Sequence, residues 1–395
     1  MTRMERGARL LLLMIAILLW GLVGYDYYHS GWQTPLGPRL DLPGQISPAQ
    51  TTSAFPAPSS LPAVTSAPSA TLLPGQQTPF PEIPSFPAAP RCNGPDTLLI
   101  LAVGSDSRGS GYLYGLGDVI RLVRVDFTLP RLTVLEIPRD IWVEIPELDP
   151  KFGIDHGKLN QAYLYGNKGM GYYSGPGEGP GLLARTLDLN FGARPDNYLA
   201  ANMQTFVRLV DAIGGVDVVL PNSVDGRKAD QSSRTDLYFE AGSHHLNGQQ
   251  ALTLARLRQL STFERADNQN LVLCAVRKSL LTPSNLPKLP EIIAAFDGAI
   301  QTDLSPQQIS QLACLLPQLQ AQNINFVTFP LETLRATRTY DKGVQKDVYI
   351  FQADFETLRA YVNAFTLGQW PAPLPALPIT LTPGKTSRGE TFTCP

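Results

Sequence analysis

The residues best suited to chemistry begin in a turn rich in glycine and serine that follows an apolar run. This turn, Gly104-Ser-Asp-Ser-Arg-Gly-Ser-Gly111, contains Asp106 and Arg108. Its backbone N–H groups are of the kind that bind phosphate, but it lacks the Gly-Lys-Ser/Thr ending of a Walker loop. Asp118 comes just before the next predicted strand, so pairing of the two strands would bring Asp106 and Asp118 to one sheet end. Two carboxylates with phosphate oxygens and water are a usual environment for Mg²⁺, although two solvated loop residues fit the same spacing.

A second group of polar residues is rich in arginine and comes from four later segments. They are Glu136-Ile-Pro-Arg139-Asp140, Lys158-Leu-Asn160, Arg256-Leu-Arg258, and Arg265 with Gln269. Gln269 lies one helical turn after Arg265 and shares its helix face. Arg256 and Arg258 can serve one site only where the backbone is extended or turns. Each arginine alone is most simply a solvated surface residue. Together, many guanidinium groups and few acids suit a polyanionic phosphate ligand.

The elements that must position these residues alternate between strand and helix patterns. Strands are predicted at Thr97–Val103, Val119–Phe127, Leu132–Ile137, Val216–Leu220 and Ile324–Phe329. Helices are predicted at Leu182–Asn190, Met203–Ile213, Gln249–Ala255, Arg265–Leu281, Glu291–Ala299, Pro306–Leu316 and Ala353–Phe365. This interleaving predicts an α/β fold with helices packed on a mixed central sheet.

The N-terminus predicts a membrane anchor. Arg3, Arg6 and Arg9 precede an apolar run that ends in a cluster of aromatic residues, as a spanning helix over residues 10–28 would. The basic flank, residues 1–9, then stays cytoplasmic and the rest of the chain lies outside the cell. A cleaved signal peptide is the alternative, but no small-x-small cleavage site follows the run.

Residues 29–91 predict an extended linker. Fourteen prolines fall between Pro35 and Pro90, and no charged residue occurs between Leu42 and Pro81. Such a segment favours polyproline-II geometry and cannot bury a core, so we expect a stalk, with a partner-recognition motif as the alternative. Residues 370–395 form a second proline-rich tail. The whole chain of 395 residues has a net charge of −2 and 17% charged residues, which argues against nucleic-acid binding.

The four cysteines predict disulfides rather than a metal site. No Cys-x-x-Cys spacing occurs, and an even number of cysteines in an exported chain is typical of disulfide bonding. Cys92 and Cys394 lie at the two edges of the folded region, whereas Cys274 and Cys314 lie on two predicted helices. The sequence permits three pairings, and we favour Cys274–Cys314 with Cys92–Cys394.

The ordered series of motifs resembles the LytR-CpsA-Psr family over roughly residues 96–282. The most specific parts are Ile137-Pro-Arg-Asp140 and Leu209-Val-Asp-Ala-Ile-Gly-Gly-Val216, followed by Leu246-Asn-Gly-Gln-Gln-Ala-Leu252. The resemblance implies an α-β-α sandwich that is anchored in the cell membrane and faces outward. It also implies a phosphotransferase that moves a glycopolymer from a polyprenyl-pyrophosphate carrier to a peptidoglycan hydroxyl. Residues 92–285 would then be the catalytic domain and 286–369 a C-terminal α/β extension.

The resemblance also implies roles for single residues. Asp106 and Asp118 would hold Mg²⁺ and, with Arg139, would be catalytic. The residues that would bind pyrophosphate are Arg108, Arg139, Arg256, Arg258, Arg265 and Gln269. Two positions depart from the family pattern, because Leu116 and Asn268 stand where arginine is usual.

Two other functions fit the same residues. A non-catalytic receptor for polyprenyl phosphates that regulates envelope assembly would keep the arginines. A hydrolase of the pyrophosphate carrier would use water, although neither a Gly-x-Ser-x-Gly elbow nor a Ser/His/Asp constellation supports a serine hydrolase. Asp118 and Asp140 are the candidates for the base of a transferase. The residues that would line a lipid cavity are not identifiable at this level.

Overall fold

The computed structural model describes residues 35–44, 89–107, 115–228, 233–257, 262–285, 300–371 and 392–394. Several predicted features lie outside these residues: the basic flank, the membrane anchor, most of the linker and of the tail, the helix at 291–299, Arg108 and Arg258. Within the described ranges, none of the helices combines the length and the apolar character needed to cross a bilayer.

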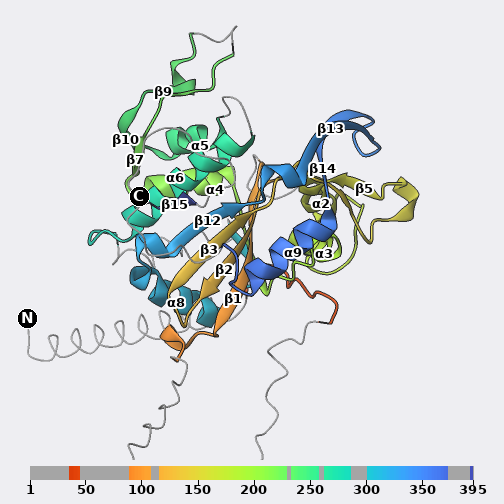
Figure 1. The fold of residues 1–395 in the computed structure, drawn as a ribbon, viewed down its shortest axis with the longest axis horizontal. Coiled ribbons are helices and arrows are strands. Elements are labelled where there is room, and N and C mark those ends of the chain that lie inside the picture. Colours follow the sequence, from red (N-terminus) through yellow and green to blue (C-terminus); the bar gives the residue numbers. More distant parts are fainter. Residues whose placement is uncertain are drawn as a thin grey trace, which may run out of the picture. The chain divides into compact units, whose positions relative to one another are not determined.

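Seven of the described strands form one mixed sheet, shown in Figure 1. In spatial order they are β11 (Ile300–Thr302), β6 (Asn197–Asn202), β1 (Thr97–Ser105), β2 (Gly117–Asp126), β3 (Arg131–Glu136), β12 (Ile324–Thr328) and β15 (Phe392–Thr393). The β1–β6 and β3–β12 pairs are parallel and the other four are antiparallel. The three strands predicted at the start of the folded region are therefore confirmed as neighbours.

Both faces of the central strands are buried, which explains the continuous apolar run of β1. Leu99, Leu101 and Val103 pack on one face, against helices α2, α3 and α9. Leu98 and Ile100 point to the other face, toward residues of α6 and α8. The sheet thus lies between two helical layers, and the predicted α/β fold with a mixed central sheet is confirmed.

The helices of the two layers have the following bounds. One layer contains α2 (Leu159–Gly166), α3 (Glu178–Phe191) and α9 (Phe355–Thr366). The other side of the sheet carries α4 (Met203–Ala212), α5 (Gly248–Arg256), α6 (Thr262–Leu280) and α8 (Pro306–Leu315). A separate apolar cluster joins α4, α5 and α6 to the hairpin-like pair β7 (Val216–Leu220) and β10 (Gly242–Leu246).

Smaller sheets complete the described chain. They are β4 (Trp142–Glu144) with β5 (His156–Lys158), β8 (Val224–Asp225) with β9 (Tyr238–Phe239), and β13 (Leu334–Asp341) with β14 (Lys346–Ala353). Short 3₁₀ turns lie at Arg91–Asn93, Pro150–Phe152, Thr235–Leu237, Leu316–Gln318, Ala321–Asn323 and Leu331–Thr333. The β13–β14 pair, α2 and β6 have no counterpart among the predicted elements.

Part of the predicted linker is packed, contrary to expectation. Leu40 and Leu42 are 1% and 3% exposed and belong to the core on the α2–α3 side of the sheet. Arg185 on α3 donates to the backbone oxygens of Leu40 (2.9 Å) and Asp41 (2.6 Å). Burial of the two leucines and the charge-assisted hydrogen bonds from Arg185 together hold this part of the proline-rich segment against the domain. At the other end of the chain, the range predicted as an extension contributes β11 and β12 to the central sheet.

The favoured disulfide pairing is wrong. The structure joins Cys92 to Cys314 and Cys274 to Cys394, with Cα–Cα distances of 5.9 and 5.5 Å. The 3₁₀ turn that carries Cys92 lies against α8, which carries Cys314. Strand β15 places Cys394 at the sheet edge, in the same apolar cluster as Cys274 of α6. Both pairings follow from packing between layers, which cysteine spacing does not encode.

Candidate functional site

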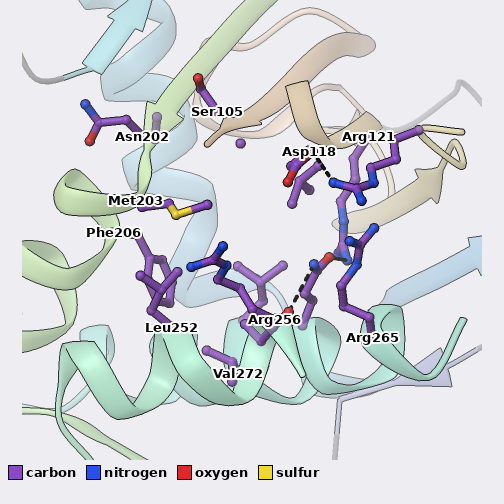
Figure 2. Close-up of a pocket in the computed structure, with 17 residues that line it drawn as sticks. Ser105, Asp118, Arg121, Asn202, Met203, Phe206, Leu252, Arg256, Arg265 and Val272 are labelled. Atoms are coloured by element: carbon purple, nitrogen blue, oxygen red, sulfur yellow. Dashed lines mark hydrogen bonds and ion pairs between the residues drawn. The ribbon is translucent and has the colours of Figure 1, made fainter. Parts of the chain in front are cut away.

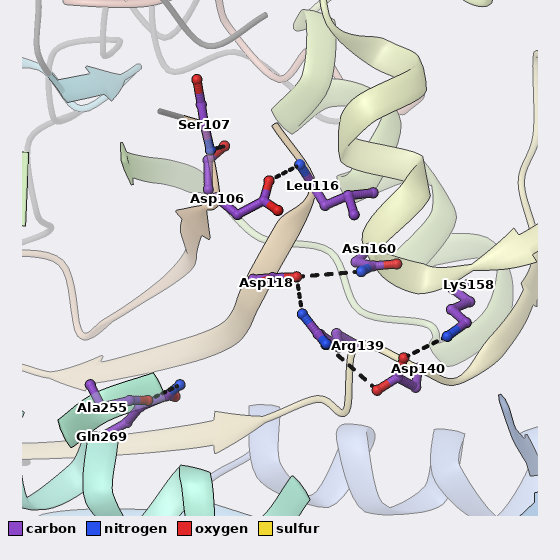
Figure 3. Close-up of polar contacts among 11 residues, drawn as sticks. Asp106, Ser107, Leu116, Asp118, Arg139, Asp140, Lys158, Asn160, Ala255 and Gln269 are labelled. Carbon is purple, nitrogen blue, oxygen red and sulfur yellow. Dashed lines mark hydrogen bonds and ion pairs between the residues drawn. The ribbon is translucent and has the colours of Figure 1, made fainter. Parts of the chain in front are cut away.

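The two predicted metal-binding carboxylates lie at one end of the sheet, where β1 and β2 meet. The ladder between these strands shifts register at Gly104 and Ser105, and Asp106 follows directly. The Asp106 N–H donates to the Leu116 oxygen at 3.0 Å, and the Leu116 N–H donates to Asp106 Oδ1 at 2.6 Å. Asp118 stands two residues after Leu116, on β2 (Figure 3). These hydrogen bonds hold the two carboxylates at the same strand ends, as the sequence predicted.

The surroundings of Asp106, including the charge of Asp118, shift its pKa. Burial raises the pKa of Asp106; the hydrogen bond from Leu116 lowers it, and the nearby charge of Asp118 raises it further. Neither Asp106 Oδ2 nor Asp118 Oδ2 accepts a hydrogen bond from a described residue. Two partly buried carboxylates with free oxygens suit Mg²⁺, which takes oxygen ligands and keeps several waters. The described residues contain no larger cluster of metal-ligating side chains.

Arg139 connects the second predicted motif to Asp118. Its Nη1 donates to Asp118 Oδ1, and its Nε lies 3.5 Å from Asp140 Oδ2. Asp140 also accepts from Lys158 Nζ at 2.9 Å, and Asn160 Nδ2 approaches Asp118 Oδ1 at 3.5 Å (Figure 3). The Ile-Pro-Arg-Asp and Lys-Leu-Asn segments therefore meet at this site.

The two candidate bases differ in their surroundings. Asp140 is 5% exposed and lies between the cations of Arg139 and Lys158. Asp118 lines a cavity, and Asp140 is not among the lining residues. Only Asp118 of these two candidates is therefore placed to meet a ligand.

The cavity lies between the ends of β1, β2 and β6 and helices α4, α5 and α6, with a volume of about 460 Å³. Its lining includes the apolar side chains of Met203, Phe206, Leu252, Val272 and Leu273. It also includes the charged and amide side chains of Asp118, Arg121, Arg139, Arg256, Arg265 and Gln269. In Figure 2, Met203, Phe206 and Leu252 lie on one side of Arg256, whereas Asp118, Arg121 and Arg265 lie on the other. Such a cavity suits an amphiphile with an anionic end.

The arginines predicted to bind phosphate are placed by two helix ends. Arg256 is the last residue of α5, and Leu257 after it is extended (φ −64°, ψ 143°), as the Arg-x-Arg spacing required. Arg256 is exposed and has no hydrogen-bond or ion-pair partner among the described residues. Arg265 and Gln269 lie one turn apart on α6, and both line the cavity. Arg256, Arg265 and Arg139 thus converge on one cavity, as the sequence predicted.

Sequence reasoning missed Arg121 and the apolar lining. Arg121 on β2 is 2% exposed, lines the cavity and forms an ion pair with Glu136 at 3.1 Å. Burial lowers the pKa of its guanidinium and the charge of Glu136 raises it. The signal was present, since Arg121 interrupts an apolar strand between Ile120 and Leu122, and a buried charge is rarely without a partner. The apolar lining gave no signal, because core and cavity leucines look alike in a helix pattern.

Fold and site together define an α/β protein in which a mixed sheet lies between two helical layers. Its cavity is lined by both apolar and cationic side chains. The chain belongs to the LytR_cpsA_psr family, whose model matches residues 77–363. The family resemblance found in the motifs is therefore confirmed, and the match runs through both the predicted catalytic domain and most of the predicted extension.

Two curated relatives and one solved structure are similar to the chain. "Regulatory protein MsrR" of Staphylococcus aureus (strain COL) is 26% identical over 247 residues, which cover 61% of this chain and 68% of MsrR. "Polyisoprenyl-teichoic acid--peptidoglycan teichoic acid transferase TagU" of Oceanobacillus iheyensis is 29% identical over 240 residues, 60% of this chain and 67% of TagU. The crystal structure of B. subtilis TagV matches with a TM-score of 0.51 and 22% identity, covering 69% of this chain and 97% of TagV. The structural likeness shows the shared fold.

Proposed function

We propose that this protein is a glycopolymer phosphotransferase. Its donor is a glycan linked to polyprenyl pyrophosphate, and its acceptor is a hydroxyl group of peptidoglycan. The acceptor hydroxyl gives up its proton, for which Asp118 is the candidate base, and its oxygen attacks the sugar-linked phosphorus. The bond from that phosphorus to the bridging oxygen breaks, and polyprenyl phosphate leaves. The transferase name of TagU, 29% identical to this chain, supports the reaction class.

One observation carries this proposal: the cavity is divided into an apolar and a cationic side. The apolar side, with Phe206, Leu252 and Val272, suits the hydrocarbon tail of a lipid carrier. The cationic side suits two phosphates, because guanidinium groups bind phosphate oxygens through charge-assisted hydrogen bonds. A hydrophilic nucleotide or sugar phosphate would leave the apolar side exposed to water.

The chain's own residues position the headgroup and stabilise its charge. Arg256 and Arg265 contact the pyrophosphate, and Arg139, held by Asp118 and Asp140, supports the charge that develops on the leaving phosphate. Catalysis of phosphoryl transfer depends mostly on such positioning and charge stabilisation. Arg108 and Arg258, outside the described residues, are proposed to add two further cations.

Asp106 and Asp118 would hold a magnesium ion. Burial raises the pKa of Asp106 and the charge of Asp118 raises it further; a divalent cation would relieve the repulsion between the two carboxylates. When bound, the ion would neutralise charge on the pyrophosphate. Together with Arg139, these two residues are the proposed catalytic group.

The domain is proposed to work outside the cell, anchored by residues 10–28. Protease added to intact cells is then expected to remove the folded domain. A domain that resists protease until the cells are lysed would contradict this topology.

The transfer assay uses purified protein, a lipid-linked glycan, peptidoglycan and Mg²⁺, and it measures release of polyprenyl phosphate. A transferase releases it only when peptidoglycan is present. Release without peptidoglycan indicates the hydrolase instead. Tight lipid binding without any release, under conditions in which a known transferase is active, indicates the receptor instead. The name of MsrR, a regulatory protein, supports testing for that role.

A further inference from the structure

The side-chain amide of Gln269 has one orientation that its neighbours permit. Its Oε1 accepts from Arg121 Nη2 at 3.0 Å, and its Nε2 donates to the Ala255 backbone oxygen at 3.2 Å. Arginine has donors and no acceptor, whereas a carbonyl oxygen has no donor. A flipped amide would therefore face a like partner on both sides. This leaves the second N–H of Nε2 without a partner among the described residues, on a side chain that lines the cavity.

Arg121 holds the Gln269 amide from strand β2 of the central sheet. It stands opposite Glu136 in the β2–β3 ladder and bonds to Glu136 Oε2 at 3.1 Å and to Asn270 Oδ1 at 2.8 Å. Both terminal nitrogens are thus committed to protein acceptors, and its Nε is buried without a partner in the described structure. Because the Arg121 side chain is only 3% exposed and its terminal nitrogens already donate to three protein acceptors, little of the guanidinium is presented to a ligand. We therefore expect Arg121 to act through the Gln269 amide, to which it donates a hydrogen bond.

We propose that Arg121 is a positioning residue that sets Gln269 as a hydrogen-bond donor to the anionic headgroup. The chain of contacts runs from Glu136 through Arg121 and Gln269 to Ala255, the residue before Arg256 on α5. It joins the sheet to the helix end that carries the exposed cation. This inference rests on the proposed function, and it extends that function to a residue which none of the sequence motifs contains.

The test is a double-mutant cycle read as headgroup affinity. The full chain and its Arg121→Met, Gln269→Ala and doubly substituted variants are titrated with geranylgeranyl pyrophosphate by calorimetry. Gln269→Ala is expected to weaken binding by about tenfold, the effect of losing one hydrogen bond to a charged group. Arg121→Met is expected to weaken it by a similar factor. The double variant is expected to be no weaker than either single variant, because coupled residues are not additive.

A second ligand separates positioning from general damage to the cavity. Geranylgeraniol has the same tail but ends in a neutral hydroxyl. Arg121→Met is expected to change its affinity by less than about twofold, because the apolar side of the cavity is untouched. An equal loss for both ligands would show that Arg121 only supports the fold, and would overturn the inference.

Two further variants control for stability and for charge. Arg121→Met leaves Glu136 as an unpaired, partly buried carboxylate, so the test is repeated with Arg121→Met and Glu136→Gln combined. Arg124→Met is the matched control: Arg124 lies on the same strand, pairs with Asp126 at 3.3 Å and does not line the cavity. It is expected to bind geranylgeranyl pyrophosphate as the parent does.

The outcomes distinguish this inference from the proposed function. Additive losses in the double variant would show that Arg121 acts independently of Gln269, which overturns the inference and leaves the phosphotransferase proposal standing. Failure of the parent itself to bind geranylgeranyl pyrophosphate would overturn both.

Discussion

Arg256→Ala is the sharpest probe of the cationic side of the cavity. Arg256 is exposed, ends α5 and has no partner among the described residues, so its loss breaks no internal ion pair. Its charge at a helix C-terminus contributes less than about 1 kcal/mol to stability. The variant should therefore fold as the parent does. Arg139 is a poorer probe, because removing it also releases Asp118 and Asp140.

The expected effect of Arg256→Ala is on binding. Hydrogen bonds to charged groups contribute about 1.5–3 kcal/mol, and the exposure of Arg256 favours the lower end, so affinity should fall about tenfold. Because salt screens exposed charges, the loss should shrink between about 0.05 and 1 M salt. The assay is calorimetric titration with geranylgeranyl pyrophosphate at both ionic strengths.

The matched control is Arg359→Ala, which removes the same charge from the opposite helical layer. Arg359 lies on α9 and donates to the Leu189 backbone oxygen at 2.7 Å, away from the cavity lining. Its loss should leave binding unchanged. If Arg256→Ala and Arg359→Ala have equal affinities, Arg256 does not contact the headgroup, and the argument from its unpartnered charge is refuted.

Four further predictions concern the two metal-site carboxylates, a missing arginine and the disulfides. Folding raises the pKa of Asp106 above 3.8, mainly through burial. Ionising Asp106 therefore costs more in the folded protein than in the unfolded chain, and the folded protein is less stable by that cost once the pH exceeds the raised pKa. Below about pH 3.8 Asp106 is protonated in both states and the cost is absent. Asp106→Asn should accordingly raise the melting temperature at pH 7 in metal-free buffer, with a difference that vanishes in acid, and should abolish stabilisation by Mg²⁺; a parent that Mg²⁺ does not stabilise would contradict the metal proposal. Asp118→Asn should sharply reduce Mg²⁺-dependent transfer while near-ultraviolet circular dichroism is retained; turnover at the parental rate would show that this carboxylate is an ordinary loop residue. Leu116→Arg restores an arginine usual in the family and should raise affinity for geranylgeranyl pyrophosphate. Unchanged affinity would show that an arginine at this position does not contribute to headgroup binding. Non-reducing peptide mapping should recover Cys92–Cys314 and Cys274–Cys394, and any other pairing would contradict the packing of α8 and β15.

The sequence predicted where several of the candidate residues meet, because local patterns encode strand ends. Asp106 and Asp118 flank a turn between two apolar strands, and antiparallel neighbours must bring such residues to one end of a sheet. Arg265 and Gln269 share a helix face through their spacing alone. The family motifs then assigned roles that geometry by itself leaves open.

Other features depended on contacts between distant segments. Arg121 became a site residue only when α6 packed over β2 and brought Gln269 and Asn270 to its guanidinium. The same layer packing chose the disulfide partners and buried Leu40 and Leu42. Spacing along a chain carries no information on which layer a segment will meet.

The sequence by itself determined the α/β class, the strand ends that carry acid and arginine, and the family. The tertiary structure decided how the cavity is divided, because an apolar lining residue and an apolar core residue have the same pattern in sequence. It also decided which charges are committed. Arg139 is tied to two aspartates and Arg121 to Glu136, whereas Arg256 has no ion-pair partner among the residues that the structure describes. Ion pairing depends on distances of a few ångströms between side chains on neighbouring strands and loops, and only folding establishes those distances.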